Sequence, residues 1–304
     1  MRPVEWVIAH WRLAAVAALF FLGVAVRRRG WAPVSAGKTL LNLVFNVGLP
    51  LLVLGALGGV TLERQHALLP AAAVGTVLIC WGAGAFAARR FGLPRRSEGA
   101  MALAAMSINV SMVYPFAALS FSPAEFSQLV MFDMGHAVCV WTLGTVVACS
   151  YGGHRGDIPV LLKRVLGAPA LWVLLVVFGL KIADVRLPEA SLRVSLSTGQ
   201  AFVLLVPLAM GLIVSGGAMR RPEVMTAVAL RSGLGGLAGF ALATLFGLTG
   251  TAHSIATVAA AAPVGFSAVV LSGREDLDLE IAASAAAISV FLGSVWIPFA
   301  VALV

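Results

Sequence analysis

The chain has 304 residues, of which 60% are hydrophobic and 11% charged, and its mean hydropathy is +0.99. Soluble domains have apolar and charged shares of roughly one half and one quarter, so this composition excludes an ordinary soluble domain and predicts an all-α polytopic membrane protein. The formal net charge of +8 does not indicate nucleic-acid binding, because the basic residues fall in short loops between apolar segments, where they act as topology signals.

Ten apolar segments follow one another, each close to the ~20 residues that a helix needs to cross ~30 Å of hydrocarbon. The predicted helices span residues 8–26, 39–57, 67–91, 99–121, 126–150, 163–182, 198–219, 223–246, 253–272 and 279–304. The first is followed at once by Arg27, Arg28 and Arg29 without a small-residue cleavage site, so we expect a retained helix and no signal peptide. The longest loops, residues 151–162 and 183–197, leave no room for a soluble insertion.

Lysine and arginine are concentrated in alternate loops between these segments. The richer loops hold Arg27, Arg28, Arg29, Lys38, Arg89, Arg90, Arg95, Arg96, Arg155, Lys163, Arg164, Arg220, Arg221 and Arg274. Positive loops face the cytoplasm, so we expect a multi-pass protein of the cell's inner (plasma) membrane with both termini outside the cytoplasm.

With five helices in each half, the second half starts on the opposite side of the membrane, so any repeat must be inverted. We therefore predict two five-helix repeats, residues 1–152 and 153–304. Their second helices carry Pro50 and Pro207, which we expect to kink them, and their fourth helices carry Pro115 and Pro263. Interrupted membrane helices in corresponding positions of two halves are typical of a transporter's binding site.

The fourth segment combines Asn109, Ser111 and Pro115 at membrane depth, and the ninth combines Pro263 with Gly265 and Ser267. A proline inside a helix removes a backbone donor and clashes one turn back, so both helices should be broken. Half-helix ends that meet at mid-membrane can form an anion site from free N–H groups alone. The simpler alternative for the serines is a hydrogen bond to a carbonyl of their own helix.

The order of these motifs resembles the auxin efflux carrier family, which includes plant auxin exporters and bacterial carriers of malonate and other carboxylates. The resemblance is carried by the run Leu-Asn-Leu-Val-Phe-Asn-Val-Gly-Leu-Pro at 41–50, Asn109 with Pro115, the run Val-Pro-Leu-Ala-Met-Gly-Leu at 206–212, and Pro263 before the closing helix. It implies a scaffold of helices 1, 2, 6 and 7, and a transport core of helices 3–5 and 8–10. Helices 4 and 9 would cross at their breaks, and Asn109 would contact the substrate's carboxylate.

This chain departs from the family pattern at two positions. Ser267 stands where the family usually has a second asparagine, and Asp133 stands where the fifth helix often carries one. The residues expected at the substrate site are Asn46, Asn109, Ser111, Tyr114, Pro115, Arg231, Pro263, Gly265 and Ser267. The resemblance also suggests a homodimer through the scaffold helices.

Asp133 and Arg231 are the ionisable residues deepest in apolar sequence, and an intramembrane charge is a functional candidate by default. They could pair with each other, or Arg231 could attract an anionic substrate while Asp133 takes a proton or cation. The alternatives are a purely structural salt bridge or an arginine that reaches the membrane surface. His136, one turn after Asp133, could extend a proton relay or simply hydrogen-bond its neighbour.

The chain shows neither a nucleotide-binding motif nor cysteine spacing typical of a metal site, so we expect no cofactor or metal beyond a coupling H⁺ or Na⁺. The Gly235–Gly239 spacing indicates close helix packing. The predicted function is a secondary transporter, not an enzyme, that moves a small carboxylate-bearing anion through an elevator-like core movement.

Two alternative functions remain open. An intramembrane serine protease could use Ser267, but His253 lies about fourteen residues, or ~20 Å, along the same helix. A passive channel would need a repeated ring of pore-lining charges, which the sequence lacks.

Overall fold

The computed structural model describes residues 3–59, 64–152, 169–213 and 221–304, and within these ranges every named element is a helix. Six continuous stretches of the described chain are long and apolar enough to cross a membrane. They are Val34–Gly58, Ala67–Arg90, Pro123–Gly152, Glu189–Ile213, Pro222–Leu245 and Leu279–Ala302. This architecture confirms a polytopic helical membrane protein.

Three of the predicted positions in the first half are occupied by α1, by an irregular helix, and by α4. The bounds are α1 Pro3–Arg28, α2 Val34–Leu43, the π-helical turn η1 Val44–Gly48, α3 Leu49–Gly58 and α4 Arg64–Arg90. The fourth position is broken into α5 Arg95–Met106, the 3₁₀ turn η2 Val110–Met112 and α6 Tyr114–Ser120. The fifth comprises α7 Pro123–Cys139, the π-helical turn η3 Val140–Gly144 and α8 Thr145–Gly152.

The second half follows the same order from α10 onward. Its elements are α10 Pro169–Ile182, α11 Glu189–Val203, α12 Leu205–Ile213, α13 Pro222–Val228, the π-helical turn η4 Ala229–Leu234 and α14 Gly235–Leu245. The ninth position is broken into α15 Gly250–Ala260 and α16 Phe266–Arg274, and α17 Leu279–Ala302 closes the chain. The predicted repeat boundary after residue 152 and the start of the sixth helix at 163 fall on residues outside the described ranges.

Local sequence signals explain several helix ends. α7 begins with a capping box, in which the Ser122 hydroxyl accepts a hydrogen bond from the Glu125 N–H at 3.3 Å and the Glu125 carboxylate accepts one from the Ser122 N–H at 2.7 Å. Pro50 and Pro207 also mark irregular helix, since η1 lies just before Pro50 and the helix is interrupted at Leu204, shortly before Pro207.

The seventh helix corrects one sequence prediction, because it begins at Glu189 and not at Thr198. Its first turns are polar, so hydropathy alone assigned them to a loop. They are helical because Leu192, Leu196 and Gly199 form one face, spaced about one turn apart, that packs closely on α3. Tertiary packing of that stripe, and not mean hydropathy, fixes where the helix starts.

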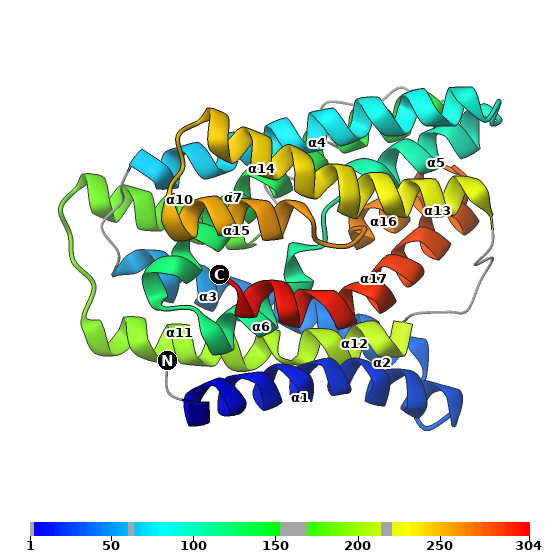
Figure 1. Ribbon diagram of the computed structural model, residues 1–304. Coiled ribbons are helices and arrows are strands. Elements are labelled where there is room, and N and C mark those ends of the chain that lie inside the picture. Colours follow the sequence, from blue (N-terminus) through cyan, green and yellow to red (C-terminus); the bar gives the residue numbers. More distant parts are fainter. Residues whose placement is uncertain (1–2, 60–63, 153–168, 214–220) are drawn as a thin grey trace.

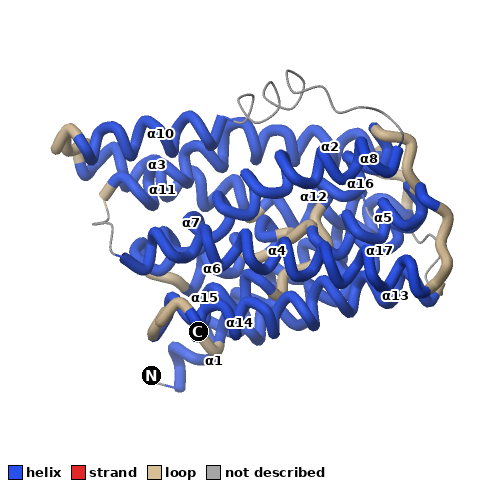
Figure 2. Tube along the Cα trace, turned by 90° about the horizontal axis from the view of Figure 1, so that it is seen from above, coloured by secondary structure: helices blue, strands red, loops and turns tan. Residues whose placement is uncertain are grey.

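The helices form two groups (Figure 1). In the first group α12 packs on α1 and α2, and α3 packs between α11 and α10, which Figure 2 shows side by side. In the second group α4 contacts α5, α7 and α14, while α15 packs on α14 and α16 on α17. The predicted close packing at Gly235 and Gly239 is confirmed, because both glycines face α15 with no space for a Cβ.

The broken fourth helix lies deep within the second group. Every residue from Gly99 to Met106 is buried, enclosed by α4, α8, α13, α16 and α17. Irregular backbone at membrane depth is tolerated only where protein or water surrounds it. The enclosure of α5 therefore permits the break that follows Met106.

Candidate functional site

The two broken helices cross at their breaks. Ile108 and Val264 form an isolated antiparallel bridge, in which the Asn109 N–H donates to the Pro263 carbonyl and the Gly265 N–H donates to the Ser107 carbonyl, both at 2.8 Å. We call residues 107–109 and 263–265 the crossing ladder. Each break thus supplies partners for backbone groups that the other leaves without a helical partner.

The prolines lie beside the ladder in different ways. Pro263 is part of it, and its ring packs against Gly293 of α17, where a Cβ would overlap the ring. Pro115 lies in the first turn of α6, where a missing N–H leaves no gap in the helix. The break in the fourth helix therefore precedes Pro115 by several residues.

A serine that the sequence analysis missed completes the ladder from α17. The Val264 N–H donates to Ser289 Oγ at 3.0 Å, and this hydroxyl donates in turn to the Ala286 carbonyl at 3.1 Å. The sequence signal for this contact is weak, because a serine in an apolar helix usually bonds only to its own backbone.

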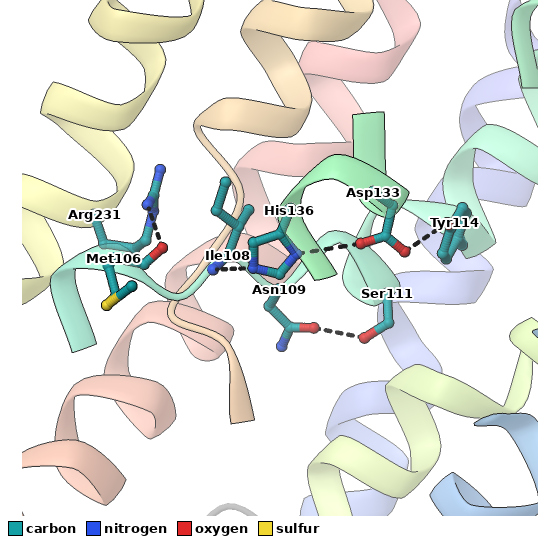
Figure 3. A network of polar contacts seen from close by, with 8 residues as sticks. All are labelled: Met106, Ile108, Asn109, Ser111, Tyr114, Asp133, His136 and Arg231. Atoms are coloured by element: carbon teal, nitrogen blue, oxygen red, sulfur yellow. Dashed lines mark hydrogen bonds and ion pairs between the residues drawn. The ribbon is translucent and has the colours of Figure 1, made fainter. Parts of the chain in front are cut away.

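A chain of polar contacts joins α7 to the ladder (Figure 3). The Ile108 N–H donates to His136 Nε2 at 3.0 Å, so this nitrogen carries the lone pair and the ring proton is on Nδ1. His136 Nδ1 lies 3.3 Å from one oxygen of Asp133, and the Tyr114 hydroxyl donates to the other at 2.7 Å. The side chains of His136 and Asp133 are 8% and 13% exposed, so the chain of contacts is nearly shielded from solvent.

Asn109 is 4% exposed and has one unused donor. Its Oδ1 accepts a hydrogen bond from the Ser111 hydroxyl at 2.6 Å, whereas its Nδ2 has no partner among the described residues. The Ser107 hydroxyl is likewise buried without a partner. A buried polar group without a partner costs about 1–3 kcal/mol, so a ligand that bonds to it gains that energy.

The start of α16 lies beside Asn109. Gly265, which is in the ladder, is the N-cap of α16, and no side chain caps this end. The first N–H groups of a helix lack helical partners and carry partial positive charge. Ser267, in the first turn, adds a half-buried hydroxyl. Asn109 Nδ2 and this helix end together offer donors of the kind that bind a carboxylate.

Arg231 and Asp133 do not pair. No ion pair joins them, since Asp133 contacts Tyr114 and His136 while the guanidinium of Arg231 bonds to backbone carbonyls. The side chain of Arg231 is 0% exposed, so it does not reach the membrane surface either.

Asn46 lies apart from these contacts. It is exposed on η1 and donates to the Asn42 carbonyl at 2.7 Å within its own helix. His253, the base that a protease would need, contacts Thr244 Oγ1 at 3.0 Å and packs on the Phe240 ring, and no recorded hydrogen bond joins it to Ser267. Within the described residues, no three His, Cys, Asp or Glu side chains are grouped to hold a metal ion.

Comparison with known proteins gives one informative likeness. The chain is 23% identical over 295 residues to an "Uncharacterized transporter" from Methanothermobacter thermautotrophicus, and the match covers 93% of this chain and 94% of that protein. No protein-family profile matches the chain. The likeness extends over nearly the whole of both proteins, so it concerns the complete helical architecture and no single motif.

Proposed function

We propose that the protein is a secondary transporter that moves a small carboxylate-bearing organic anion across the cytoplasmic membrane. The observation that carries this proposal is the unused Nδ2 donor of Asn109, buried at the crossing of two broken helices. The full-length likeness to a protein named as a transporter supports the general class. The resemblance to auxin efflux carriers supports a carboxylate as the cargo.

The anion would lie between Asn109 and the start of α16. Its carboxylate would accept hydrogen bonds from Asn109 Nδ2 and from the free N–H groups of Phe266 and Ser267. A helix N-terminus acts as roughly half a positive charge, so it favours a carboxylate without an exposed cationic side chain. Ser111 would hold the amide orientation, because its hydroxyl occupies Asn109 Oδ1 and leaves Nδ2 for the ligand.

Movement of the second helix group against the first would expose the site alternately to the two sides. Contacts between the groups involve α6, α7, η2 and α17, whereas the main contacts of α16 stay within the second group. The broken helix of the first repeat therefore contacts the first helix group, whereas the broken helix of the second repeat makes its main contacts within the second group. This difference between inverted repeats is expected for one end state of alternating access. A shallow apolar hollow of about 250 Å³ opens at the surface beside α1 and α6. It is lined by Trp11, Ala15, Val16, Leu19, Leu119 and Leu204.

We further propose ten membrane helices in a 5+5 inverted repeat, with the first group as scaffold and the second as moving core. The basic ends of α1, α4 and α16 lie at the same end of the molecule in Figure 1, which supports a cytoplasmic position for that end. Both termini would then lie outside the cytoplasm. The exposed apolar residues Trp172, Leu175 and Val176 of α10 would face lipid or a second copy's scaffold.

Asp133 and His136 would couple transport to a proton or a cation. A proton added to His136 Nε2 would displace the Ile108 N–H, so protonation would loosen the break beside Asn109. Asp133→Asn keeps the size of the side chain but removes its charge. We expect it to change the pH or sodium dependence of uptake into proteoliposomes; an unchanged dependence would remove Asp133 from the coupling mechanism.

Ligand-induced thermal stabilisation of the purified protein tests the substrate assignment. The panel contains mono- and dicarboxylates and indole-3-acetate, each at two pH values and with or without sodium. A ligand at 100 times its Kd stabilises the folded state by about 2.7 kcal/mol, which raises the unfolding temperature measurably. At least one carboxylate should do so.

Two variants show whether the ligand binds at the crossing. Asn109→Asp keeps the side-chain shape and the acceptor for Ser111 but replaces the unused donor by oxygen, so it should abolish the shift. Asn42→Ala, at an exposed position of α2, should leave it unchanged. If no carboxylate stabilises the protein, or if the shift survives Asn109→Asp, the carboxylate site is wrong.

A further inference from the structure

Arg231 places a fully buried cation at membrane depth, where an isolated charge is costly. It lies in the π-helical turn η4, between α13 and α14 of the second helix group. Its guanidinium donates from Nη1 to the carbonyls of Ala105 and Met106, at 3.0 and 3.4 Å, and from Nη2 to the carbonyl of Ala260 at 2.5 Å. These three oxygens come from two different helices.

All three carbonyls belong to helix C-termini. Ala105 and Met106 end α5, and Ala260 ends α15. The last four carbonyls of a helix have no helical donor, and the C-terminus carries a partial negative charge of about half an elementary charge. Two such ends facing one guanidinium would together balance about one positive charge. Arg231 therefore needs no carboxylate partner.

The residues around η4 leave space for the guanidinium of Arg231. A Cβ on Gly235 would overlap Nη2 of Arg231 and would lie 2.5 Å from the Ala260 carbonyl oxygen. On the other side, Cys80 of α4 donates its thiol proton to the Leu230 carbonyl at 3.7 Å, within the same turn. The wide turn and the missing side chain at Gly235 leave the planar guanidinium fork of Arg231 free to reach α5 and α15.

The carbonyls that Arg231 holds lie within three residues of the start of the crossing ladder in both chain segments. Met106 is followed by Ser107, and Ala260 lies three residues before Pro263. In the view of Figure 3 the guanidinium of Arg231 and the amide of Asn109 lie on opposite sides of this segment. Arg231 thus contacts the helix ends that lead into the ladder. It does not contact the side on which Asn109 presents its unused donor.

We propose that Arg231 is a positioning residue that fixes the ends of α5 and α15 at a set separation and so keeps the crossing ladder in register. It acts on the anion site through Asn109 and the start of α16, and it does not itself bind the cargo. Arg231 would act in this way whichever substrate is carried, because its contacts are with backbone carbonyls.

Hydrogen exchange of the ligand-free protein, followed by mass spectrometry, tests this role with Arg231→Lys. Lysine keeps the charge but cannot span two helix ends with a planar fork. Exchange should rise at least about tenfold in peptides over 104–112 and 260–267, as expected from the loss of one hydrogen bond to a charged group. Peptides of α3 and α11, in the first helix group, should not change.

Gly233→Ala is the matched control, because it lies in the same turn and its Cβ would meet nothing within 4 Å. It should leave both ladder peptides unchanged. If Arg231→Lys does not fold, Gly235→Ala replaces it, since it keeps the arginine and displaces only the fork.

Two outcomes would overturn the proposal. Unchanged exchange at both ladder peptides would show that the ladder does not need Arg231, and a simultaneous loss of carboxylate stabilisation would make Arg231 an anion ligand. A uniform rise throughout the protein would reduce its role to general stability. Because exchange is measured without ligand, a protein that binds no carboxylate would refute the proposed cargo and leave this test intact.

Discussion

Gly235→Ala is the substitution for which the structure gives the sharpest expectation. In most helices this change stabilises, because alanine has a helix propensity about 1 kcal/mol better than glycine. Here the added Cβ would overlap the guanidinium of Arg231 and press on the Ala260 carbonyl. The guanidinium of Arg231 must then lose its hydrogen bonds to the C-terminus of at least one of the two helices, α5 or α15.

The cost follows from the bonds displaced. A hydrogen bond to a charged group contributes about 1.5–3 kcal/mol, and leaving a buried charge without its partner costs about 3–5 kcal/mol. Subtracting the gain in helix propensity of about 1 kcal/mol leaves a net loss of roughly 2–4 kcal/mol for Gly235→Ala. Gly233→Ala adds a Cβ in open space, so it should be neutral or stabilising by up to about 1 kcal/mol.

Thermal unfolding in detergent, followed by tryptophan fluorescence at one fixed scan rate, compares the two variants. At about 2 °C per kcal/mol for a chain of this size, Gly235→Ala should unfold roughly 4–10 °C below Gly233→Ala. Equal unfolding temperatures, or a more stable Gly235→Ala, would show that the guanidinium finds other partners and that its fork is not required.

Substitutions at three further positions probe the same region. Ser289→Ala leaves the buried Val264 N–H without its acceptor, so it should destabilise the protein by about 1–3 kcal/mol in thermal unfolding, whereas Ser289→Thr should retain most of the stability. Gly293→Ala should lower the yield of folded protein in size-exclusion chromatography, because its Cβ would overlap the rigid ring of Pro263. His136→Phe leaves the buried Ile108 N–H without its acceptor and should destabilise the protein by about 1–3 kcal/mol in thermal unfolding; an unchanged unfolding temperature would show that this contact does not hold the break.

Helix positions and the two breaks were predictable because they depend on signals local in sequence. The apolar runs predicted ten helices, and six of these positions are continuous spans of the described chain. A polar cluster with a proline marked each break. The start of the seventh helix was wrong because contacts with α3, absent from the local sequence, stabilise its polar first turns. Hydropathy measures partition into lipid, whereas those turns pack against protein.

The partners of the intramembrane charges were not predictable from depth. Counting residues placed Asp133 and Arg231 at similar depths, which suggested a pair, but depth says nothing of rotation about the helix axis. The π-helical turn η4 changes that rotation locally and directs Arg231 toward α5 and α15. The short-range part of the site, His136 beside Asp133 at i, i+3, did follow from the sequence.

A broken helix at membrane depth exposes backbone groups that no water can satisfy, and here several of these groups receive a partner from another element. The Ile108 N–H is bonded by α7, the Val264 N–H by α17, and the terminal carbonyls of α5 and α15 by Arg231. Of the other N–H groups of the ladder, those of Asn109 and Gly265 bond to the opposite chain segment, and that of Ser107 bonds to the Leu103 carbonyl of α5.

The buried polar groups that have no hydrogen-bond partner in this arrangement are therefore informative. Maintaining the breaks uses three surrounding helices, yet among the described residues Asn109 Nδ2, the Ser107 hydroxyl and Arg231 Nε stay buried without a protein partner. Native interiors rarely keep such groups unless a ligand or water completes them. Because the same contacts that hold the ladder also hold Asn109 in place, a ligand that bonds to Nδ2 meets a donor already oriented, and its binding free energy is not spent on ordering the site.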